Sequence, residues 1–144
     1  MTKNSILFVI AMFNLTIASA QVKLEKIKGS KIVTVTTKEV ESFENVEIEE
    51  FLDVYFVKSE KTSIEIEADD NLHDIISYNV LGNTLKLTAL KQPTGEKKLA
   101  IRVNYNDSLK TIVARHESKI NALADISLEN ITIKNFDKSQ SFLN

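Results

Sequence analysis

The chain has 144 residues, a formal net charge of −2 and no cysteine or tryptophan. This mildly acidic composition argues against nucleic-acid binding, because that function needs a basic patch to neutralise phosphates. The lack of cysteine excludes disulfide bonds, thiol catalysis and sulfur-ligated metals. Stability must therefore come from the burial of apolar side chains.

Residues 1–20 have the three parts of a secretory signal peptide. Lys3 gives a positive start, residues 5–17 are mostly apolar, and Ala18-Ser19-Ala20 offers the small residues that a signal peptidase requires. A membrane-spanning helix is the competing interpretation, but the apolar run is shorter than the ~20 residues that a bilayer needs. We therefore expect cleavage before Gln21, which leaves no stable membrane span. Residues 21–144 then form one exported domain in the periplasm, on the outer cell surface or in the medium.

Most of the remaining sequence alternates apolar and polar residues, which predicts strands with one buried and one solvated face. No stretch carries a sustained helical stripe, so the predicted class is all-β. Around Leu72, Ile75 and Ile76 a single helical turn and a bent strand are both compatible with the pattern. The alternating segments are residues 46–49, 52–57, 64–67, 85–88, 99–104 and 131–134.

Sharp turns are rare, because the chain has only three glycines and one proline. One hairpin is predicted at Gly82-Asn83, between strands at residues 76–81 and 84–89. The other corners are rich in Asn, Asp, Ser and Lys, which suits a coil that bends repeatedly.

A faint repeat points to the same kind of coil. Residues 108–114 can be laid over residues 127–133 at an offset of 19. The steps from Val46 to Ile64 and from Ile64 to Leu85 are 18 and 21 residues. One rung of a β-solenoid takes about 20 residues, although an evenly spaced meander would give similar intervals.

Several segments together resemble a family of exported bacterial domains, typical of Bacteroidetes, that is described as putative auto-transporter adhesin, head GIN domain. The resemblance runs from Gly29 to the end of the chain. It implies a right-handed parallel β-helix or solenoid, with some antiparallel hairpin pairing in the N-terminal half, and a non-catalytic role. The segments that carry it are residues 42–48, 52–56, 63–68, 82–87, 101–103 and 108–133.

The sequence departs from this family in two places. Family members often have a glycine before the strand that starts at Asp53, whereas this chain has Phe51-Leu52, so we expect a bend that is wider or more buried. Family members also usually continue for further rungs beyond the position of Asn144. We therefore expect either a truncated domain or a terminal edge, at residues 139–143, that a partner or a second copy covers.

No catalytic motif is present, and we predict neither an enzyme nor a cofactor. The densest polar segment contains Asp69, Asp70 and Asp74, whose oxygens are candidate ligands for calcium. A solvated corner in which Asp69 or Asp70 caps a short turn is the favoured interpretation, because the spacing is not that of an EF-hand.

Outward-facing side chains give the remaining candidates. Tyr55 and Tyr105 are expected to be exposed, either as ordinary surface residues or as rings that stack on sugars. Four glutamates share the polar side of the strands with three basic residues, which predicts cross-strand ion pairs rather than a catalytic carboxylate pair. These residues are Glu47, Glu49, Glu65, Glu67, Lys86, Arg102 and Lys134.

Taken together, these features predict an adhesin-like, non-enzymatic binding module that recognises a glycan or a protein. Two alternatives stay open at this stage. One is a polysaccharide-active enzyme on a β-helix, and the other is an envelope scaffold that docks, or associates with itself, through its open terminal rung.

Overall fold

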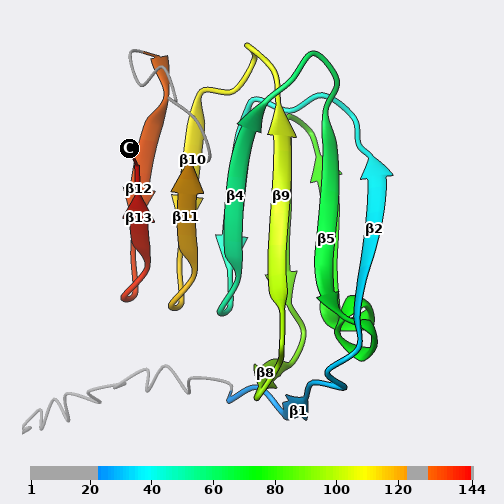
Figure 1. Ribbon diagram of the computed structural model, residues 1–144. Helices are drawn as coiled ribbons and strands as arrows, with labels where there is room; N and C mark the ends of the chain where they lie inside the picture. The colour runs from blue at the N-terminus through cyan, green and yellow to red at the C-terminus, as the bar shows by residue number, and fades with distance from the viewer. Residues whose placement is uncertain (1–22, 123–129, 144) are drawn as a thin grey trace, which may run out of the picture.

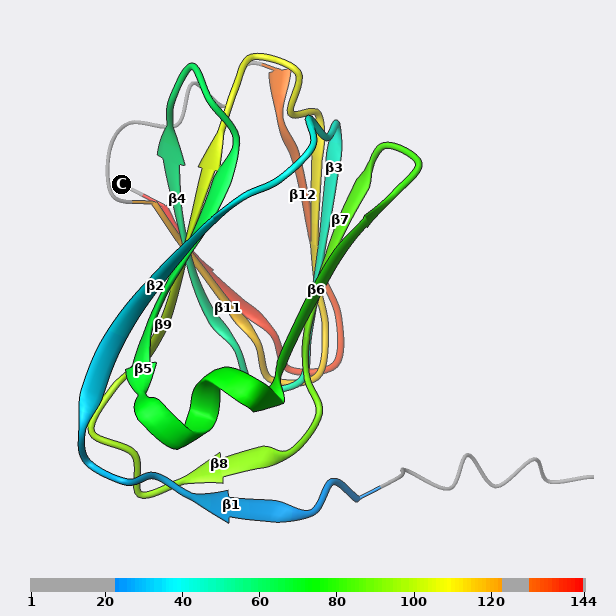
Figure 2. The same ribbon diagram turned by 90° about the vertical axis from the view of Figure 1, so that its right-hand side faces the viewer.

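The computed structural model describes residues 23–122 and 130–143, and the expected signal peptide with its cleavage site at Ala18, Ala20 and Gln21 lies outside them. Within the described residues the protein is all-β, as predicted, apart from one short 3-10 helix. Two large sheets face each other across the core, and a small two-stranded sheet lies at one end (Figures 1 and 2). In these ranges no helix has the length and apolar character needed to cross a membrane.

The six-stranded sheet faces the viewer in Figure 1 and has the order β13-β11-β4-β9-β5-β2. The five-stranded sheet behind it has the order β12-β10-β3-β7-β6, and β1 pairs with β8 below. The strands are β1 Lys26–Lys28, β2 Val33–Glu39, β3 Asn45–Glu49, β4 Asp53–Lys58, β5 Ser63–Asp69, β6 Ile76–Leu81, β7 Thr84–Ala89, β8 Gln92–Thr94, β9 Leu99–Tyr105, β10 Thr111–Ala114, β11 Lys119–Ala122, β12 Thr132–Asn135 and β13 Gln140–Phe142; the 3-10 helix η1 is Asp70–Ile75.

Both large sheets are mixed. The strands β9, β4, β11 and β13 pair in parallel, and so do β7, β3, β10 and β12. Antiparallel pairs join β2 to β5, β5 to β9 and β6 to β7. The predicted combination of parallel strands with antiparallel pairing towards the N-terminal half is therefore present. Three successive strand pairs, β3–β4, β10–β11 and β12–β13, stack in register and cross from one sheet to the other.

The predicted repeat is right in kind but wrong in register. Ile112 pairs with Ile133, 21 residues later, rather than with Ile131. A slip of two residues keeps the same side chains facing inward, so the sequence pattern could not detect it. The intervals through Ile64 are not rung steps, because this residue pairs antiparallel with Val103 in the opposite sheet from Val46 and Leu85.

The core lies between the inward faces of the two sheets and follows the predicted alternation. Each fully buried leucine, isoleucine or phenylalanine contributes about 1.5–3 kcal/mol relative to an exposed one. In a chain without disulfides this burial carries most of the stability. The largest side chains exposed by less than 2 % are Phe43, Val46, Ile48, Leu52, Phe56, Ile64, Leu72, Leu85, Leu87, Ile101, Ile112 and Ile120.

The predicted hairpin and the ambiguous segment that precedes it are both defined. Gly82 and Asn83 form the turn between β6 and β7, and Gly82 has a φ of 60°. Before β6 the chain forms the helical turn η1, whose Leu72 and Ile75 are buried. Both alternatives for this segment are thus realised in succession, a helical turn followed by a strand.

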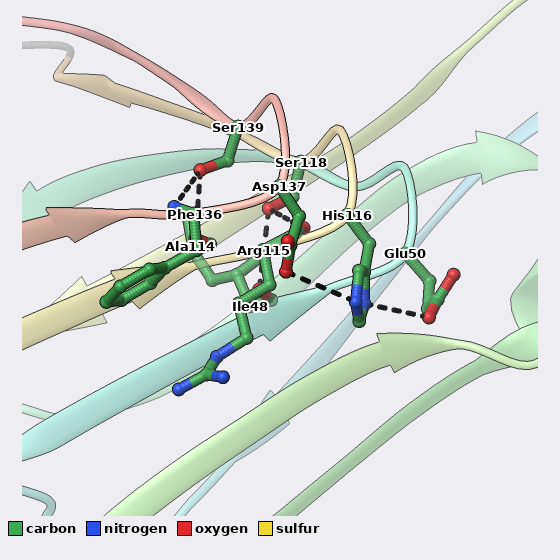
Figure 3. A network of polar contacts seen from close by, with 9 residues as sticks. All are labelled: Ile48, Glu50, Ala114, Arg115, His116, Ser118, Phe136, Asp137 and Ser139. Carbon is green, nitrogen blue, oxygen red and sulfur yellow. Dashed lines mark hydrogen bonds and ion pairs between the residues drawn. The ribbon is translucent and has the colours of Figure 1, made fainter. Parts of the chain in front are cut away.

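The corners between the two sheets are tight turns without glycine (Figure 3). Each has two consecutive residues with positive φ: Glu50-Phe51, His116-Glu117 and Asp137-Lys138. Two left-handed residues in a row reverse the chain within a short distance. The expectation of a wider bend at Phe51-Leu52 is wrong for this reason, whereas the expected burial of Leu52 is confirmed.

The three corners lie directly on one another and are bonded along the stack. The Phe51 amide donates to the His116 carbonyl at 3.0 Å, and the Glu117 amide donates to the Asp137 carbonyl at 3.1 Å. Between the outer two corners, the His116 ring lies 3.0 Å from Glu50 Oε1 through Nδ1 and 3.4 Å from Asp137 Oδ2 through Nε2. These contacts fix the register in which one strand pair stacks on the next.

Candidate functional site

The outward face of the six-stranded sheet has an aromatic side chain near its middle. Because Val54 and Phe56 on β4 point into the core, Tyr55 between them points outward and is half-buried by its neighbours. Tyr55 pairs with Asn121 on one side and with Arg102 on the other, and Arg102 pairs in turn with Glu65. These side chains form one row across four adjacent strands.

A hollow of about 180 Å³ lies beside Tyr55. Ala100 on β9 is one of its lining residues, and the small side chain of this residue leaves room between larger neighbours. Arg102 Nη1 contacts Glu65 Oε1 at 3.0 Å, and Lys98 Nζ lies 3.6 Å from Glu67 Oε2. Two ion pairs and one aromatic ring therefore line the hollow.

A second and larger hollow, of about 480 Å³, is lined in part by Asp53. Since Val54 pairs with Ile101, the preceding residues Asp53 and Ala100 lie on adjacent strands. Burial raises the pKa of the Asp53 carboxyl, Lys119 partly offsets this, and Glu96 raises it further. The lining residues are Phe51, Asp53, Gln92, Pro93, Glu96, Glu117, Lys119, Lys138 and Gln140.

Tyr105 is not exposed, which corrects the prediction made from the sequence. Its side chain is only 4 % exposed, and its ring packs against Phe56 with the centroids 6.2 Å apart. Burial raises the pKa of its phenol. Tyr105 follows the inward-facing Val103 by two positions, so the alternation itself places it in the core. Of the two tyrosines, only Tyr55 offers a ring at the surface.

The acidic segment that was considered for calcium is joined to neighbouring loops instead. The Asp69 side chain is buried and accepts amide hydrogens from Lys31, Lys97 and Lys98 at 2.8–3.1 Å. Asp70 accepts a hydrogen bond from the Ser30 hydroxyl. Asp69 precedes η1 but makes no side-chain capping bond to it. The capping role proposed for this residue is therefore wrong.

No group of three potential metal ligands with suitable geometry occurs in residues 23–122 and 130–143. Asp74, the third calcium candidate, is exposed on η1. The two histidines are far apart in the fold: His73 contacts Thr34 Oγ1 at 2.9 Å, and His116 lies in the stacked corners. The structure thus does not bring the titratable candidates together.

The predicted cross-strand ion pairs are confirmed for two of the glutamates. Glu65 pairs with Arg102 on the six-stranded sheet, and Glu47 lies 3.7 Å from Lys86 on the five-stranded sheet. Lys134 lies on β12 beside Val113 rather than beside a glutamate. Ala100 is a lining residue that the alternation of the strands does not single out, although a small residue among large polar ones at outward positions of a strand is a signal of a surface hollow.

Residues 42–141 match the family described as putative auto-transporter adhesin, head GIN domain. The chain belongs to this family. This match confirms, over most of the chain, the resemblance to head GIN domains that the sequence shows. No curated protein matches the chain.

Solved structures of similar fold include proteins from Bacteroides and Parabacteroides. A putative adhesin from Bacteroides fragilis superposes with a TM-score of 0.71 at 21 % identity, over 81 % of this chain and 55 % of its own. A putative adhesin from Parabacteroides merdae superposes with a TM-score of 0.63 at 19 % identity, over 77 % of this chain and 47 % of its own. A putative lipid binding protein from Parabacteroides distasonis superposes with a TM-score of 0.59 at 16 % identity, over 68 % of this chain and 44 % of its own. At this identity the likeness shows the fold, and the chain spans about half the length of these structures.

Proposed function

We propose that the protein is an exported, non-enzymatic binding module, adhesin-like in role, that holds a surface glycan or a protein at the outer face of the six-stranded sheet. Membership of the head GIN family supports an adhesin-like surface protein. The signal-like residues 1–20 support export to the periplasm, the outer surface or the medium. The parallel stacking of three strand pairs supports a right-handed β-helix as the architecture that presents this face.

One observation carries the choice of face. Tyr55 stands beside a hollow whose polar groups are already paired and positioned, Arg102 with Glu65 and Lys98 with Glu67. A ring with an apolar face beside fixed hydrogen-bonding groups suits a ligand that is itself partly apolar and rich in hydroxyls. Positioned groups also lower the entropic cost of binding.

A binding screen tests this proposal directly. The chain from Gln21 onward would be screened against glycans and extracellular-matrix proteins, together with the Tyr55→Ala and Arg102→Ala variants. We expect at least one ligand whose affinity falls about tenfold or more in both variants. Lys86→Ala is the matched control, because it removes a cross-strand pair on the opposite sheet and should bind normally. Binding that is unaffected by Tyr55→Ala and Arg102→Ala would contradict the choice of face.

A polysaccharide-active enzyme is the second candidate, and one observation favours it. The raised pKa of Asp53, beside Glu96 in the larger hollow, is the property expected of a general acid. This candidate predicts release of reducing ends from a polysaccharide by the wild-type chain and loss of that activity in Asp53→Asn. Absence of cleavage with and without calcium would support the binding module instead.

Association through β12 and β13 is a further proposal for how the protein meets a partner or a second copy. Among residues 23–122 and 130–143, these strands are the outermost of the two sheets on one side, and Phe142 is 53 % exposed there. Strands that present unpaired backbone groups readily pair with another chain. Light scattering should show a dimer or larger species that Phe142→Lys converts to a monomer. A monomer in both cases would contradict it.

A further inference from the structure

The row that contains Tyr55 continues across all six strands of the sheet. The pairing registers place Phe142, Asn121, Tyr55, Arg102, Glu65 and Thr37 side by side, one from each strand from β13 to β2. Figure 1 looks onto this sheet, whose strands run from β13 on the left to β2 on the right. With strands about 4.8 Å apart, the row is about 24 Å long.

The row carries two aromatic rings, on alternate strands. Tyr55 and Phe142 are separated by the single strand β11, hence by about 9.5 Å. Phe142 is 53 % exposed, although a large apolar side chain is usually buried. Between the two rings lies Asn121, whose amide can donate and accept hydrogen bonds. Phe142 is exposed because the register places it beside Asn121, on the outward face of the sheet.

Charge along the row is balanced. Arg102 and Glu65 neutralise each other at 3.0 Å, and the other four positions carry no charge. A strongly acidic or basic ligand would gain little from such a surface. The two aromatic rings are also separated by a polar residue, so the row does not form the continuous apolar patch that a lipid chain needs.

We infer that the row binds a neutral, linear glycan that lies across the strands, with sugar rings on Tyr55 and Phe142. This inference rests on the proposed function and names its ligand class. One hexose ring in an extended chain is about as long as the spacing between strands. In an extended β-1,4-linked chain successive rings face opposite ways, so every second ring presents the same face. Aromatic side chains on alternate strands match that repeat.

The test is isothermal titration calorimetry with soluble β-1,4-linked glucan, mannan and xylan oligosaccharides, whose length increases from two rings to six. For at least one series, affinity should rise with length. Tyr55→Ala should weaken binding about tenfold at every length. Phe142→Ala should weaken it three- to tenfold, and only for oligosaccharides long enough to reach both aromatic rings. Circular dichroism would check that each variant is folded.

Phe136→Ala is the matched control, because Phe136 is also exposed, at 46 %, but lies outside the row in the β12–β13 corner. It should bind as the wild type does. If a protein or a short or branched glycan binds through Tyr55 and Arg102 with no dependence on chain length or on Phe142, the inferred row is wrong and the proposed function stands. If Tyr55→Ala weakens the binding of no ligand from either experiment, both the inferred row and the proposed binding face are wrong.

Discussion

Three backbone amides from two distant loops converge on the carboxylate of Asp69. Burial raises the pKa of this carboxyl, but the amides of Lys31, Lys97 and Lys98 and the charge of Lys31 outweigh burial and lower the pKa below its usual range. Asp69 thereby ties the segment before β2 and the segment before β9 to the end of β5. The sequence showed a cluster of acids here but could not show the donors, which lie 28–38 residues away.

We predict that Asp69→Asn destabilises the protein most at neutral pH. In the unfolded chain the Asp69 pKa is about 3.9. Because the folded pKa is lower, the stabilisation is complete above about pH 4 and is lost as the pH falls through the folded pKa. Urea unfolding between pH 7 and pH 3 should therefore show a gap between wild type and variant that narrows on acidification. A gap that is independent of pH would contradict this role for the charge.

Gly29 is required next to this carboxylate for steric reasons. A Cβ at this position would lie 2.3 Å from Asp69 Oδ2 and 2.7 Å from Glu96 Cα. We predict that Gly29→Ala lowers the free energy of unfolding by about 1–3 kcal/mol. Gly82→Ala separates this clash from a backbone effect, because a Cβ there meets open space although φ is 60°. Both variants would be measured by urea unfolding, and a Gly29→Ala variant as stable as the wild type would contradict the clash.

At the scale of elements, the stacked corners show how the chain reverses direction with so few glycines. Residues with side chains occupy the left-handed region at Glu50, Phe51, His116, Glu117, Asp137 and Lys138. Each such residue is less stable there than in a right-handed conformation, by about 1–2 kcal/mol. The backbone bonds between successive corners compensate for part of this strain.

We predict that Glu117→Gly stabilises the protein by up to about 1 kcal/mol, because glycine removes the left-handed strain at a φ of 62°. Glu39→Gly is the matched control at the end of β2, where φ is not positive. That change should destabilise by roughly 0.5–1 kcal/mol through the entropy of the unfolded chain. Thermal unfolding of both variants gives the comparison. A lower melting temperature for Glu117→Gly would contradict the strain.

The elements themselves could largely be predicted from the sequence, since alternation locates a strand and Gly82-Asn83 locates a hairpin. Pairing could not. Val46 pairs with Leu85 on one side and with Ile112 on the other, and nothing local distinguishes these partners from Ile64. A period of two reports which face is buried but leaves open which strand lies alongside.

For the molecule as a whole, the sheets have a well-packed middle and outer strands with fewer neighbours. We predict that amides of β12 and β13 exchange with solvent faster than those of β4 and β9, which have a strand on each side. Ile120→Ala should raise exchange in β11 and β13 far more than in β2, because stacked units transmit a defect mainly to their neighbours. Uniform acceleration across the sheet, measured by mass spectrometry, would indicate a single cooperative unit instead.

The candidate site could be predicted only in part at this scale. Tyr55 was identified as an outward-facing ring, but its neighbours Arg102 and Asn121 come from strands 47 and 66 positions further along the chain. A binding face made of one residue from each strand cannot be recognised until the order of the strands is known. The polar residues Asn104, Asn106 and Asp107 predict a corner around Tyr105 and hence an exposed ring, whereas β9 continues to Tyr105 and places it in the core.

Thr111 and Thr132 occupy equivalent places on neighbouring strands, and exactly one stacked strand pair separates them. A tandem duplication of this 21-residue interval would therefore widen both sheets by one strand, about 4.8 Å, without altering the existing layers. The width of the sheets could then change in steps of one strand. Genes that gain or lose such intervals would yield proteins whose sheets differ in the number of strands but keep the same outward-facing residues on the strands they share.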